Sequence, residues 1–402
     1  MNIAKALEAL VDRCVDVIAR DELATRLAEG RPLRVKLGID PSGPLLHLGH
    51  AVVLRKLRQF QDLGHQAILI VGDFTARIGD PTGLSTSRKP RTQAEISADM
   101  QTYAAQAALI LDVEKAVVRY NSEWLAPISF ADVIRLSARV TVARMLERDD
   151  FSKRFKSGVP IGLHEFLYPL SQAYDSVATQ ADVELGGTEQ LFNLLMGRRL
   201  QEEEGQRPQI CMTLPILEGT DGVQRMGKSL DNYIALQDEP SVMFGKVMSI
   251  PDQLIARYWQ LATTRPKPEY EAIERDMQAN ELSARDSKVQ LAAEIVRLYH
   301  GPALARSAHD HFEKTVVRKE LPDDMPCLPL PPDEASLMLG PLLVKLGWAA
   351  SNREAARLVR QGAIKVDGKR IDDEKHRESS WRDKVLQKGN HQFARLGAEQ
   401  KR

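Results

Sequence analysis

A chain of 402 residues, 43% hydrophobic and 27% charged, is long enough for two or three domains with buried cores and has the composition of a globular protein. Its longest apolar runs, such as residues 67–71, are too short to cross a bilayer, and its N-terminal stretch lacks the apolar centre of a signal peptide. The three cysteines stand far apart, at Cys14, Cys211 and Cys327, which argues against a disulfide framework and against a zinc site. We therefore expect a cytoplasmic protein without a membrane segment or a structural metal.

Charge is unevenly distributed along the chain. Lys and Arg together number 55, as do Asp and Glu, so the formal net charge is zero. Residues 335–402, however, hold 15 basic and 8 acidic residues, which leaves a basic end on an acidic body. Such an end favours a polyanionic partner, although a solvated basic tail would have the same composition.

The first predicted elements form an alternating pattern. Residues 1–29 predict one or two amphipathic helices, and residues 34–39 alternate polar and apolar side chains as a strand does. Residues 40–44 break that strand, residues 46–63 have helical spacing, and residues 67–71 form an apolar run typical of a buried parallel strand. Strand, helix and strand in this order predict a βαβ unit and hence a doubly wound α/β fold.

The rest of the chain is mostly helical by pattern. Residues 92–200 and 232–319 show helical spacing, and residues 210–217 predict a further strand. Five prolines between positions 322 and 332 exclude regular structure there and indicate a linker. The sequence thus predicts four parts: an α/β domain with a Rossmann-like, doubly wound parallel sheet and a helical insertion over residues 1–230, an all-α domain over residues 231–320, the linker over residues 321–334, and a small α+β domain over residues 335–402.

The first candidate site lies where the first strand passes into its helix. His47 and His50 are three residues apart in the first helical turn, so their imidazoles share one face. The helix N-terminus presents free N–H groups and a partial positive charge, which favour phosphate. Gly49 leaves room for a flat ring against the backbone. The absence of Gly-x-Gly-x-x-Gly argues against a dinucleotide, and two ordinary histidines near a helix cap are the alternative interpretation.

A second candidate site is the short loop at residues 225–229. It sets two cations and a hydroxyl around a glycine, a combination suited to holding a triphosphate. Residues 40–50 resemble the HIGH signature of class I aminoacyl-tRNA synthetases, and residues 225–229 resemble their KMSKS loop, with Arg for the first Lys and Gly for the first Ser. The resemblance implies that the catalytic residues are His47, His50, Arg225, Lys228 and Ser229, and that further ATP contacts come from Gly49, Met226, Gly227 and Glu189.

Three polar residues bear on which class I synthetases the chain resembles most. Tyr168, Gln172 and Asp175 lie four and three residues apart, so on a helix a phenol, an amide and a carboxylate form one stripe. A core helix with outward polar residues would show the same spacing. Residues 168–175, 79–83 and 186–190 are nevertheless similar to tyrosyl-tRNA synthetases, and the resemblance extends over nearly the whole chain. It implies a tyrosine site formed by Asp40, Asp80, Tyr168, Gln172, Asp175 and Gln190.

The resemblance also implies how these residues act. Asp80, Tyr168 and Gln172 would hold the α-ammonium group of tyrosine. Asp175 would accept the phenolic proton, and Gln190 would lie near the carboxylate. Because that carboxylate is ionised at neutral pH, it can attack the α-phosphorus of ATP without a general base, so alignment and charge stabilisation are the main requirements. Mg²⁺ would accompany ATP, held chiefly by phosphates and water, and no tightly bound cofactor is expected.

Two positions depart from the family pattern. Glu189 replaces an aspartate near the ATP ribose, so a longer side chain has to reach the same place. Lys36 replaces a tyrosine that normally touches the phenolic hydroxyl, and the sequence assigns it no role.

The basic C-terminal part carries a third candidate site. After a capping Ser351 or Asn352, the arginines Arg353, Arg357 and Arg360 line one helical face. Residues 366–369 predict a hairpin turn. Residues 351–362 resemble the S4 RNA-binding fold, which implies that these arginines contact the phosphates of tRNA(Tyr). A solvated basic helix is the alternative. The resemblance further implies a homodimer.

Other functions remain open at this point. A tryptophanyl-tRNA synthetase shares the architecture, and a carboxylate such as Asp175 can accept from an indole as well as from a phenol. An RNA-binding protein that lost catalysis would not need His47, His50, Lys228 and Ser229. A small-molecule adenylyltransferase also uses a His-x-Gly-His helix, but would leave the helical and S4-like parts unexplained.

Overall fold

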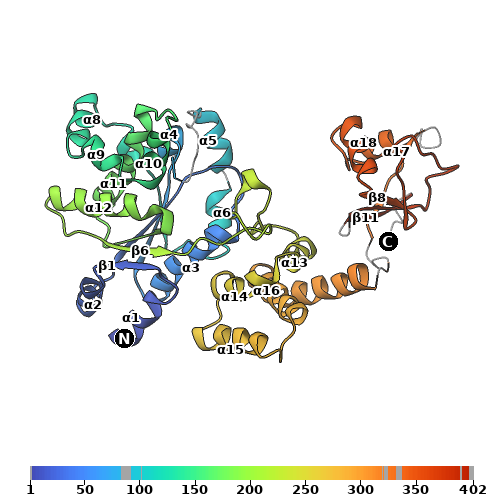
Figure 1. Ribbon diagram of the computed structural model, residues 1–402, viewed down its shortest axis with the longest axis horizontal. Helices are drawn as coiled ribbons and strands as arrows, with labels where there is room; N and C mark the ends of the chain where they lie inside the picture. Colours follow the sequence, from blue (N-terminus) through green and yellow to red (C-terminus); the bar gives the residue numbers. More distant parts are fainter. Residues whose placement is uncertain are drawn as a thin grey trace. The chain divides into compact units, whose positions relative to one another are not determined.

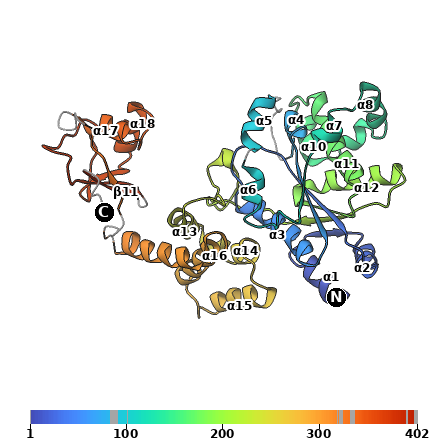
Figure 2. The same ribbon diagram turned by 180° about the vertical axis from the view of Figure 1, so that it is seen from behind.

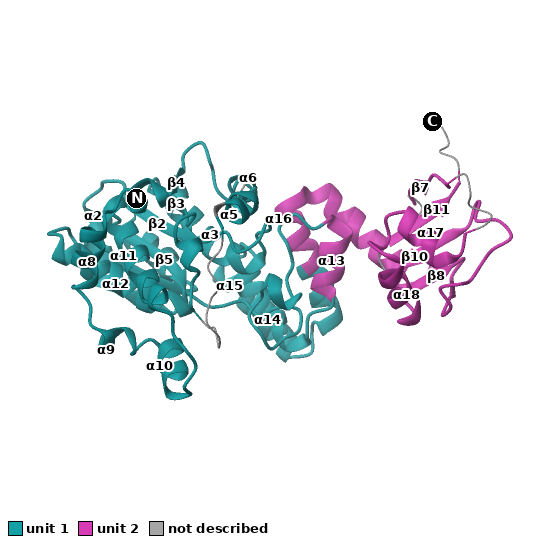
Figure 3. Cartoon of the chain, turned by 90° about the horizontal axis from the view of Figure 1, so that it is seen from above, with its two compact units in different colours: residues 1–238, 249–291 teal, residues 239–248, 292–402 magenta. Residues whose placement is uncertain are grey.

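The computed structural model describes residues 2–82, 92–100, 102–318, 320, 325–331, 337–389 and 392–397. Gly83 and half of the predicted linker, residues 321–324 and 332–334, lie outside the described residues. The chain forms two compact units, Met1–Asp238 with Ser249–Leu291 and Glu239–Met248 with Ala292–Arg402, which Figure 3 colours separately. The division into two units does not establish the boundaries of the four predicted parts, which remain predictions.

The first unit is built on a six-stranded sheet with the order β1-β6-β5-β2-β3-β4. All neighbouring strands run parallel except β1, which is antiparallel to β6. The strands predicted at residues 34–39, 67–71 and 210–217 are present as β2, β3 and β6, so the predicted doubly wound α/β fold is confirmed. The strands of this sheet are β1 Asp16–Ile18, β2 Arg34–Ile39, β3 Gln66–Val71, β4 Val117–Tyr120, β5 Val183–Gly187 and β6 Ile210–Leu214.

Three of these strands contradict the predicted pattern. The helical prediction for residues 1–29 missed β1, and the helical prediction for residues 92–200 missed β4 and β5. Strands β1 and β4 are short edge strands whose side chains are half-buried or exposed, so neither carries an apolar run. Strand β5 places the charged Glu184 in the core and ends in two glycines, which hides its strand character.

Helices cover both faces of the sheet. Helix α3, Leu48–Asp62, packs on β2, β3 and β5, and its fully buried residues Leu54, Leu57 and Phe60 have the predicted helical spacing. Helices α11, Leu167–Thr179, and α12, Leu191–Glu203, pack together on the other face (Figures 1 and 2). The remaining helices of this unit are α1 Ile3–Val11, α2 Arg20–Ala28, α4 Thr75–Ile78, α5 Gln93–Met100, α6 Tyr103–Ala107, α7 Ser122–Leu125, α8 Phe130–Ser137, α9 Val142–Met145, α10 Asp149–Lys156, α14 Ile255–Ala262, α15 Lys267–Gln278, and the short 3-10 helices η1 Leu163–Phe166, η2 Thr188–Gln190, η3 Lys228–Leu230 and η4 Asp252–Leu254.

The strand order reverses between β2 and β5. Strand β2 continues through α3 to β3 on one side, whereas β5 continues through α12 to β6 on the other. In open α/β sheets, ligands bind at the carboxyl ends of the strands where the order reverses. A ligand site is therefore expected at the residues that follow Ile39 and Gly187.

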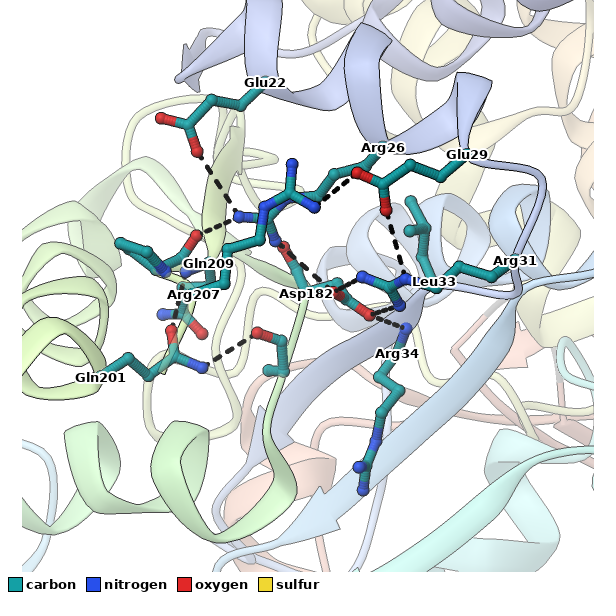
Figure 4. A network of polar contacts seen from close by, with 12 residues as sticks. Glu22, Arg26, Glu29, Arg31, Leu33, Arg34, Asp182, Gln201, Arg207 and Gln209 are labelled. Atoms are coloured by element: carbon teal, nitrogen blue, oxygen red, sulfur yellow. Dashed lines mark hydrogen bonds and ion pairs between the residues drawn. The ribbon is translucent and has the colours of Figure 1, made fainter. Parts of the chain in front are cut away.

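A polar network ties the opposite, amino-terminal ends of β2 and β5 together (Figure 4). The guanidinium of Arg31 makes a bidentate pair with Asp182, with N–O distances of 2.6 and 2.8 Å. The same carboxylate accepts from the backbone N–H of Arg34 at 2.8 Å, and the buried Arg26 donates to the backbone oxygen of Asp182 at 2.8 Å. These contacts fix the two strands that frame the reversal point.

The second unit holds α13 Pro240–Met248, most of the long helix α16 Ala284–Phe312, and the π-helix η5 Glu313–Val317. Helix α16 bends at Gly301, which has a φ of 83° and directly precedes Pro302. No described helix is both long and apolar enough to cross a membrane.

The C-terminal part of this unit is a small α+β fold, as predicted. Its sheet has the order β7-β11-β10-β8-β9 and packs with two helices around Leu342, Val359 and Trp381. Asp367 and Gly368 adopt φ of 47° and 77°, which makes the predicted hairpin turn. The elements are β7 Cys327–Leu328, α17 Leu339–Lys345, α18 Asn352–Arg360, β8 Ile364–Val366, β9 Lys369–Arg370, β10 Val385–Lys388 and β11 Gln392–Leu396.

The prediction that the proline-rich stretch has no regular structure is wrong at β7. This short strand pairs in parallel with β11. The backbone oxygens of Pro326 and Leu328 accept from the N–H groups of Arg395 and Gly397, both at 3.0 Å, and proline keeps the carbonyl that this pairing needs.

Candidate active site

The first motif lies at the start of helix α3, as the sequence predicts. His47 is the N-cap residue and has an extended backbone. Its backbone N–H donates to Nδ1 of His50 at 3.2 Å, and the centroids of the two rings are 3.9 Å apart. The two imidazoles therefore lie together at the helix N-terminus, beside the carboxyl end of β2.

Both imidazoles are neutral at neutral pH. Burial, reinforced by the positive charge of Lys228, lowers the pKa of His50 to about 3. Burial likewise lowers the pKa of His47 well below its ordinary value. Nδ1 of His47 is buried and has no hydrogen-bond partner in the described part of the chain. The rings thus offer hydrogen bonds rather than charge, and one buried nitrogen is left for a ligand.

The second motif lies directly against the first. The backbone N–H of Leu48 donates to the oxygen of Ile234 at 3.0 Å, within a short antiparallel pairing. A Cβ atom on Gly49 would lie 3.7 Å from Cβ of Met226 and 3.0 Å from the His47 ring. Glycine at this position therefore permits close approach of the 225–229 loop to the helix N-terminus.

Lys228 connects the loop to the segment that follows β2. Its Nζ donates to the backbone oxygen of Gly43 at 2.8 Å and to the hydroxyl of Tyr103 at 3.2 Å. The Tyr103 hydroxyl in turn donates to the same Gly43 oxygen at 2.7 Å. Arg225 and Ser229 are exposed on either side of this contact. The structure thus brings a primary ammonium group to the loop that precedes the two imidazoles.

Asp40 and Tyr168, predicted from separate parts of the chain, meet at the end of β2. The Tyr168 hydroxyl donates to Oδ2 of Asp40 at 2.9 Å, and the Thr75 hydroxyl donates to Oδ1 at 2.7 Å. Burial raises the pKa of Asp40 to about 7, although the hydrogen bond from Thr75 acts in the opposite direction.

Three further predicted residues share one hydrogen-bonded network. Nε2 of Gln190 donates to Oδ2 of Asp80 at 2.7 Å. Asn193 donates to Oε1 of Gln190 at 2.8 Å and to Oε1 of Gln172 at 2.9 Å. The buried guanidinium of Arg148 lies 3.2 Å from Oδ1 of Asp80 and donates to Oδ1 of Asn193 at 3.1 Å. Asn193 and Arg148 therefore fix the orientation of the predicted residues.

Asp175 is a buried carboxylate on the same helix as Tyr168 and Gln172. Nε1 of Trp124 donates to its Oδ1 at 2.8 Å, and Asn121 donates to its Oδ2 at 3.4 Å. Burial raises the pKa of Asp175 to about 7, and the nearby charge of Lys36 opposes that rise.

Glu189 lies in η2, directly after β5. A Cβ atom on Gly187 would collide with its carboxylate, so the side chain folds back over the end of the strand. Burial raises the pKa of Glu189, while the charge of Arg225 lowers it. Glu189 therefore lies within electrostatic reach of the 225–229 loop.

The predicted arginine face of the C-terminal part is present on α18. Arg353, Arg357 and Arg360 are exposed, while Ala355 and Val359 of the same helix are fully buried. Of the two capping residues that the sequence left open, Ser351 caps the helix by accepting from the backbone N–H of Glu354 at 3.2 Å.

Sequence reasoning missed five residues of the site. They lie outside the recognised motifs, and no local spacing marks them; only their polar or aromatic type was available as a signal. They are Tyr103, Asn121, Trp124, Arg148 and Asn193.

Other candidate centres in the described residues are few. No group of three or more His, Cys, Asp or Glu side chains in that part of the chain is arranged to hold a metal ion. A cavity of about 580 Å³ in the first unit lies between residues 12–15 and helices α14 and α15, and none of the predicted site residues lines it.

Comparisons with known proteins agree with this architecture. Residues 28–317 match the family described as tRNA synthetases class I (W and Y), and residues 342–377 match the S4 domain. The chain is similar to proteins named tyrosine–tRNA ligase from Thermotoga maritima, at 52% identity over 100% of both chains, and from Moorella thermoacetica, at 51% identity over 98% of this chain and 96% of the relative.

Solved structures show the same fold. The tyrosyl-tRNA synthetase of Archaeoglobus fulgidus, solved with L-tyrosine, aligns with a TM-score of 0.63 and 24% identity over 77% of this chain and all of that chain. The enzyme of Aeropyrum pernix aligns with a TM-score of 0.61 and 23% identity over 78% of this chain and 99% of that chain. With the family match covering well over half its length, the chain belongs to the class I tRNA synthetases of the tryptophan and tyrosine group.

Proposed function

We propose that this chain is a tyrosine–tRNA ligase, which activates L-tyrosine with ATP and transfers the tyrosine to the 3′ end of tRNA(Tyr). The observation that carries the proposal is the contact between the two motifs, in which Lys228 reaches Gly43 just before the paired imidazoles of His47 and His50. The full-length relatives named tyrosine–tRNA ligase support the same activity.

ATP would bind between the two motifs. The free N–H groups at the start of α3 and the neutral rings of His47 and His50 offer hydrogen bonds to the phosphates. Nδ1 of His47, which lacks a partner in the described residues, supplies one of these bonds. Lys228 and Arg225 provide the positive charge that the neutral imidazoles do not. We propose that Mg²⁺ enters with ATP, held by phosphate oxygens and water.

The activation step needs alignment and charge stabilisation. An oxygen of the tyrosine carboxylate attacks the α-phosphorus, a new P–O bond forms, and the bond to the pyrophosphate oxygen breaks. Negative charge moves onto pyrophosphate, where Lys228 and Arg225 stabilise it. No proton has to be removed from the attacking group. In the second step the ribose hydroxyl at the tRNA 3′ end attacks the carbonyl of tyrosyl-adenylate and releases AMP.

Tyrosine would be recognised at both of its ends. Asp80, Tyr168 and Gln172 hold the α-ammonium group, with Gln190 near the carboxylate. The phenolic O–H donates to the buried Asp175, which Trp124 and Asn121 hold in place. Phenylalanine leaves this carboxylate without that partner, so the site rejects it. Asp40, which accepts from the Tyr168 hydroxyl, fixes one of the ammonium-binding groups.

The tRNA and a second copy of the chain would bind elsewhere. The exposed arginines of α18 suit the phosphates of tRNA(Tyr). Residues 130–163 expose large apolar side chains, which supports a homodimer formed through this segment. They are Phe130, Ile134, Val142, Phe155 and Leu163. We propose a cytoplasmic location for the enzyme.

Amino-acid-dependent exchange of pyrophosphate into ATP tests the proposal. The purified chain is assayed with tyrosine, tryptophan and phenylalanine in parallel. We expect exchange with tyrosine alone, followed by tyrosine transfer to tRNA(Tyr). Exchange with tryptophan alone would assign the chain to the other branch of its family, and absence of exchange with all three would contradict the proposed activation step.

A further inference from the structure

Asn232, three residues after the second motif, is almost fully buried, with 2% of its surface exposed. Its Oδ1 accepts from the backbone N–H of Gly227 at 2.8 Å. Its Nδ2 donates to the backbone oxygen of Arg225 at 3.1 Å and to Oδ2 of Asp221 at 2.8 Å. One amide side chain thus holds the backbone on both sides of Met226.

The segment that Asn232 contacts is a hairpin. Glu218 and Arg225 form an isolated bridge, and the N–H of Gly219 donates to the oxygen of Gln224 at 2.9 Å. The backbone oxygen of Asn232 accepts from Thr220 at 2.8 Å. Asn232 therefore contacts both sides of the hairpin and holds them together.

The fit between Asn232 and the hairpin is sterically tight. A Cβ atom on Gly219 would clash with the side-chain amide and the backbone oxygen of Asn232. Only glycine at position 219 allows the side chain to enter. The amide is thus packed in place as well as hydrogen-bonded.

In the chain, Asn232 lies between the 225–229 loop and the segment that pairs with the start of α3. Gly227, which it holds, directly precedes Lys228, whose Nζ contacts Gly43. Ile234, which follows it closely, pairs with Leu48 at the start of α3. The same residue thus connects the cationic loop with the strand-like segment that anchors it to the imidazoles.

We propose that Asn232 is a positioning residue that holds the 225–229 loop in the geometry in which Lys228 reaches ATP. It touches no substrate itself. Its effect is to fix the loop before ATP binds, so that the charge of Lys228 needs no reorganisation during the reaction. This inference rests on the proposed role of Lys228 in ATP activation.

The variant Asn232→Asp tests the proposal with almost no change in volume. The carboxylate keeps an acceptor for Gly227 but loses both donors, and it faces the Asp221 carboxylate and the Arg225 carbonyl. We expect kcat for tyrosine-dependent pyrophosphate exchange to fall about 10- to 100-fold, in line with the loss of one or two buried hydrogen bonds. The KM for ATP should rise, while the KM for tyrosine stays within about twofold, because the tyrosine-binding residues lie on other elements.

Tryptic cleavage after Arg225 and Lys228 gives a readout that does not depend on activity. A loop released from Asn232 should be cut about tenfold faster than in the wild type, whereas the circular dichroism spectrum and thermal midpoint of the fold change little. This measurement separates the inference from the proposed function: if the wild type showed no tyrosine-dependent exchange, the cleavage rates would still report whether Asn232 holds the loop.

The double variant Asp221→Asn with Asn232→Asp supplies the rescue. The amide at position 221 can donate to the carboxylate at position 232, which restores one lost contact with its direction reversed, and it still offers an oxygen to Val223. We expect part of kcat and part of the tryptic resistance to return. The control is Asp231→Asn, which makes the same acid-to-amide exchange as Asp221→Asn but at the exposed neighbour of Asn232. It should match the wild type in both assays. Wild-type cleavage and exchange rates for Asn232→Asp, or a loss that the double variant does not reduce, would overturn the proposal.

Discussion

Lys36 and Glu184 form an ion pair of 2.9 Å between paired positions of strands β2 and β5, and each side chain is only 1% exposed. Nζ of Lys36 also donates to the Ser176 hydroxyl at 2.6 Å and to the backbone oxygen of Gln172 at 3.3 Å. The position that the family pattern gives to a phenol-touching tyrosine thus holds a buried cation under helix α11. Its partners flank Asp175, and its charge lowers the pKa of that carboxyl against the effect of burial.

The first prediction concerns pH. Burial raises the pKa of Asp175 to about 7, so acidification below that value protonates the carboxylate that would accept the phenolic O–H. Selectivity for tyrosine should therefore decrease as the pH falls from 8 to 6, because the charge-assisted hydrogen bond is lost. Burial also raises the pKa of Asp40 to about 7, but Asp40 would act on tyrosine and phenylalanine alike. The ratio of kcat/KM for tyrosine to that for phenylalanine isolates Asp175, and a ratio independent of pH would contradict its role.

The second prediction concerns the buried ion pair. Lys36→Met leaves the Glu184 carboxylate in the core without its cation, so the free energy of unfolding should fall by about 3–5 kcal/mol. The pH at which tyrosine selectivity is lost should also rise, because the charge that lowers the Asp175 pKa is gone. Urea denaturation and the kcat/KM ratio measure the two effects.

Lys36→Met combined with Glu184→Gln is the matched control for that change. It removes both charges and keeps the shape of the site, so most of the lost stability should return. If the double variant were less stable than Lys36→Met alone, Lys36 would contribute by packing and not by pairing with Glu184.

The third prediction concerns the cationic loop. Lys228→Ala should lower the rate of adenylate formation about 100- to 1000-fold, because it removes a charge that stabilises the departing pyrophosphate. Tyrosine affinity should stay nearly unchanged. Stopped-flow fluorescence for the rate and equilibrium dialysis for the affinity separate the two. Tyr103→Phe, which removes only the hydroxyl near Nζ, should cause a much smaller loss, and a large loss of tyrosine binding in Lys228→Ala would overturn the assignment.

The sequence predicted the parts of this fold that local pattern controls. The βαβ unit follows from an alternating strand, a helical stripe at Leu54, Leu57 and Phe60, and a continuous apolar run. The capping Ser351 and the turn at residues 366–369 follow from residue types with strong local preferences. In each case the information lies within about one helical turn or one strand.

What the sequence did not predict depends on contacts between distant segments. Strand β5 was missed because Glu184 interrupts its apolar pattern, and the partner of that buried charge, Lys36, lies on another strand. Arg148 and Trp124 were missed because their partners, Asp80 and Asp175, lie far away in the sequence and are neighbours only in the folded chain. No spacing in the chain encodes these pairs.

The fourth prediction concerns Arg148. Its guanidinium contacts Asp80 and Asn193 from within the core, so it fixes the residues proposed to bind the tyrosine ammonium and carboxylate groups. Arg148→Lys keeps the charge but loses the planar set of donors, and the KM for tyrosine should rise about tenfold with the KM for ATP unchanged. Arg144→Lys, the same exchange at an exposed position of the preceding helix, serves as control. A parallel rise in both KM values would instead indicate a general loss of structure.

The last prediction concerns the arginine face of α18. If Arg353 and Arg357 contact tRNA phosphates, replacing both by alanine should raise the KM for tRNA(Tyr) and leave tyrosine-dependent pyrophosphate exchange unchanged, because the exchange reaction involves no tRNA. Each lost phosphate contact should also reduce the slope of log affinity against log salt by about 0.9 for a duplex segment, so the double variant should bind with a visibly weaker salt dependence. Filter binding at several salt concentrations measures that slope. Arg382→Ala removes a basic side chain of the same module outside α18, and an equal effect there would mean that the net charge of the module, and not the helix face, determines tRNA affinity.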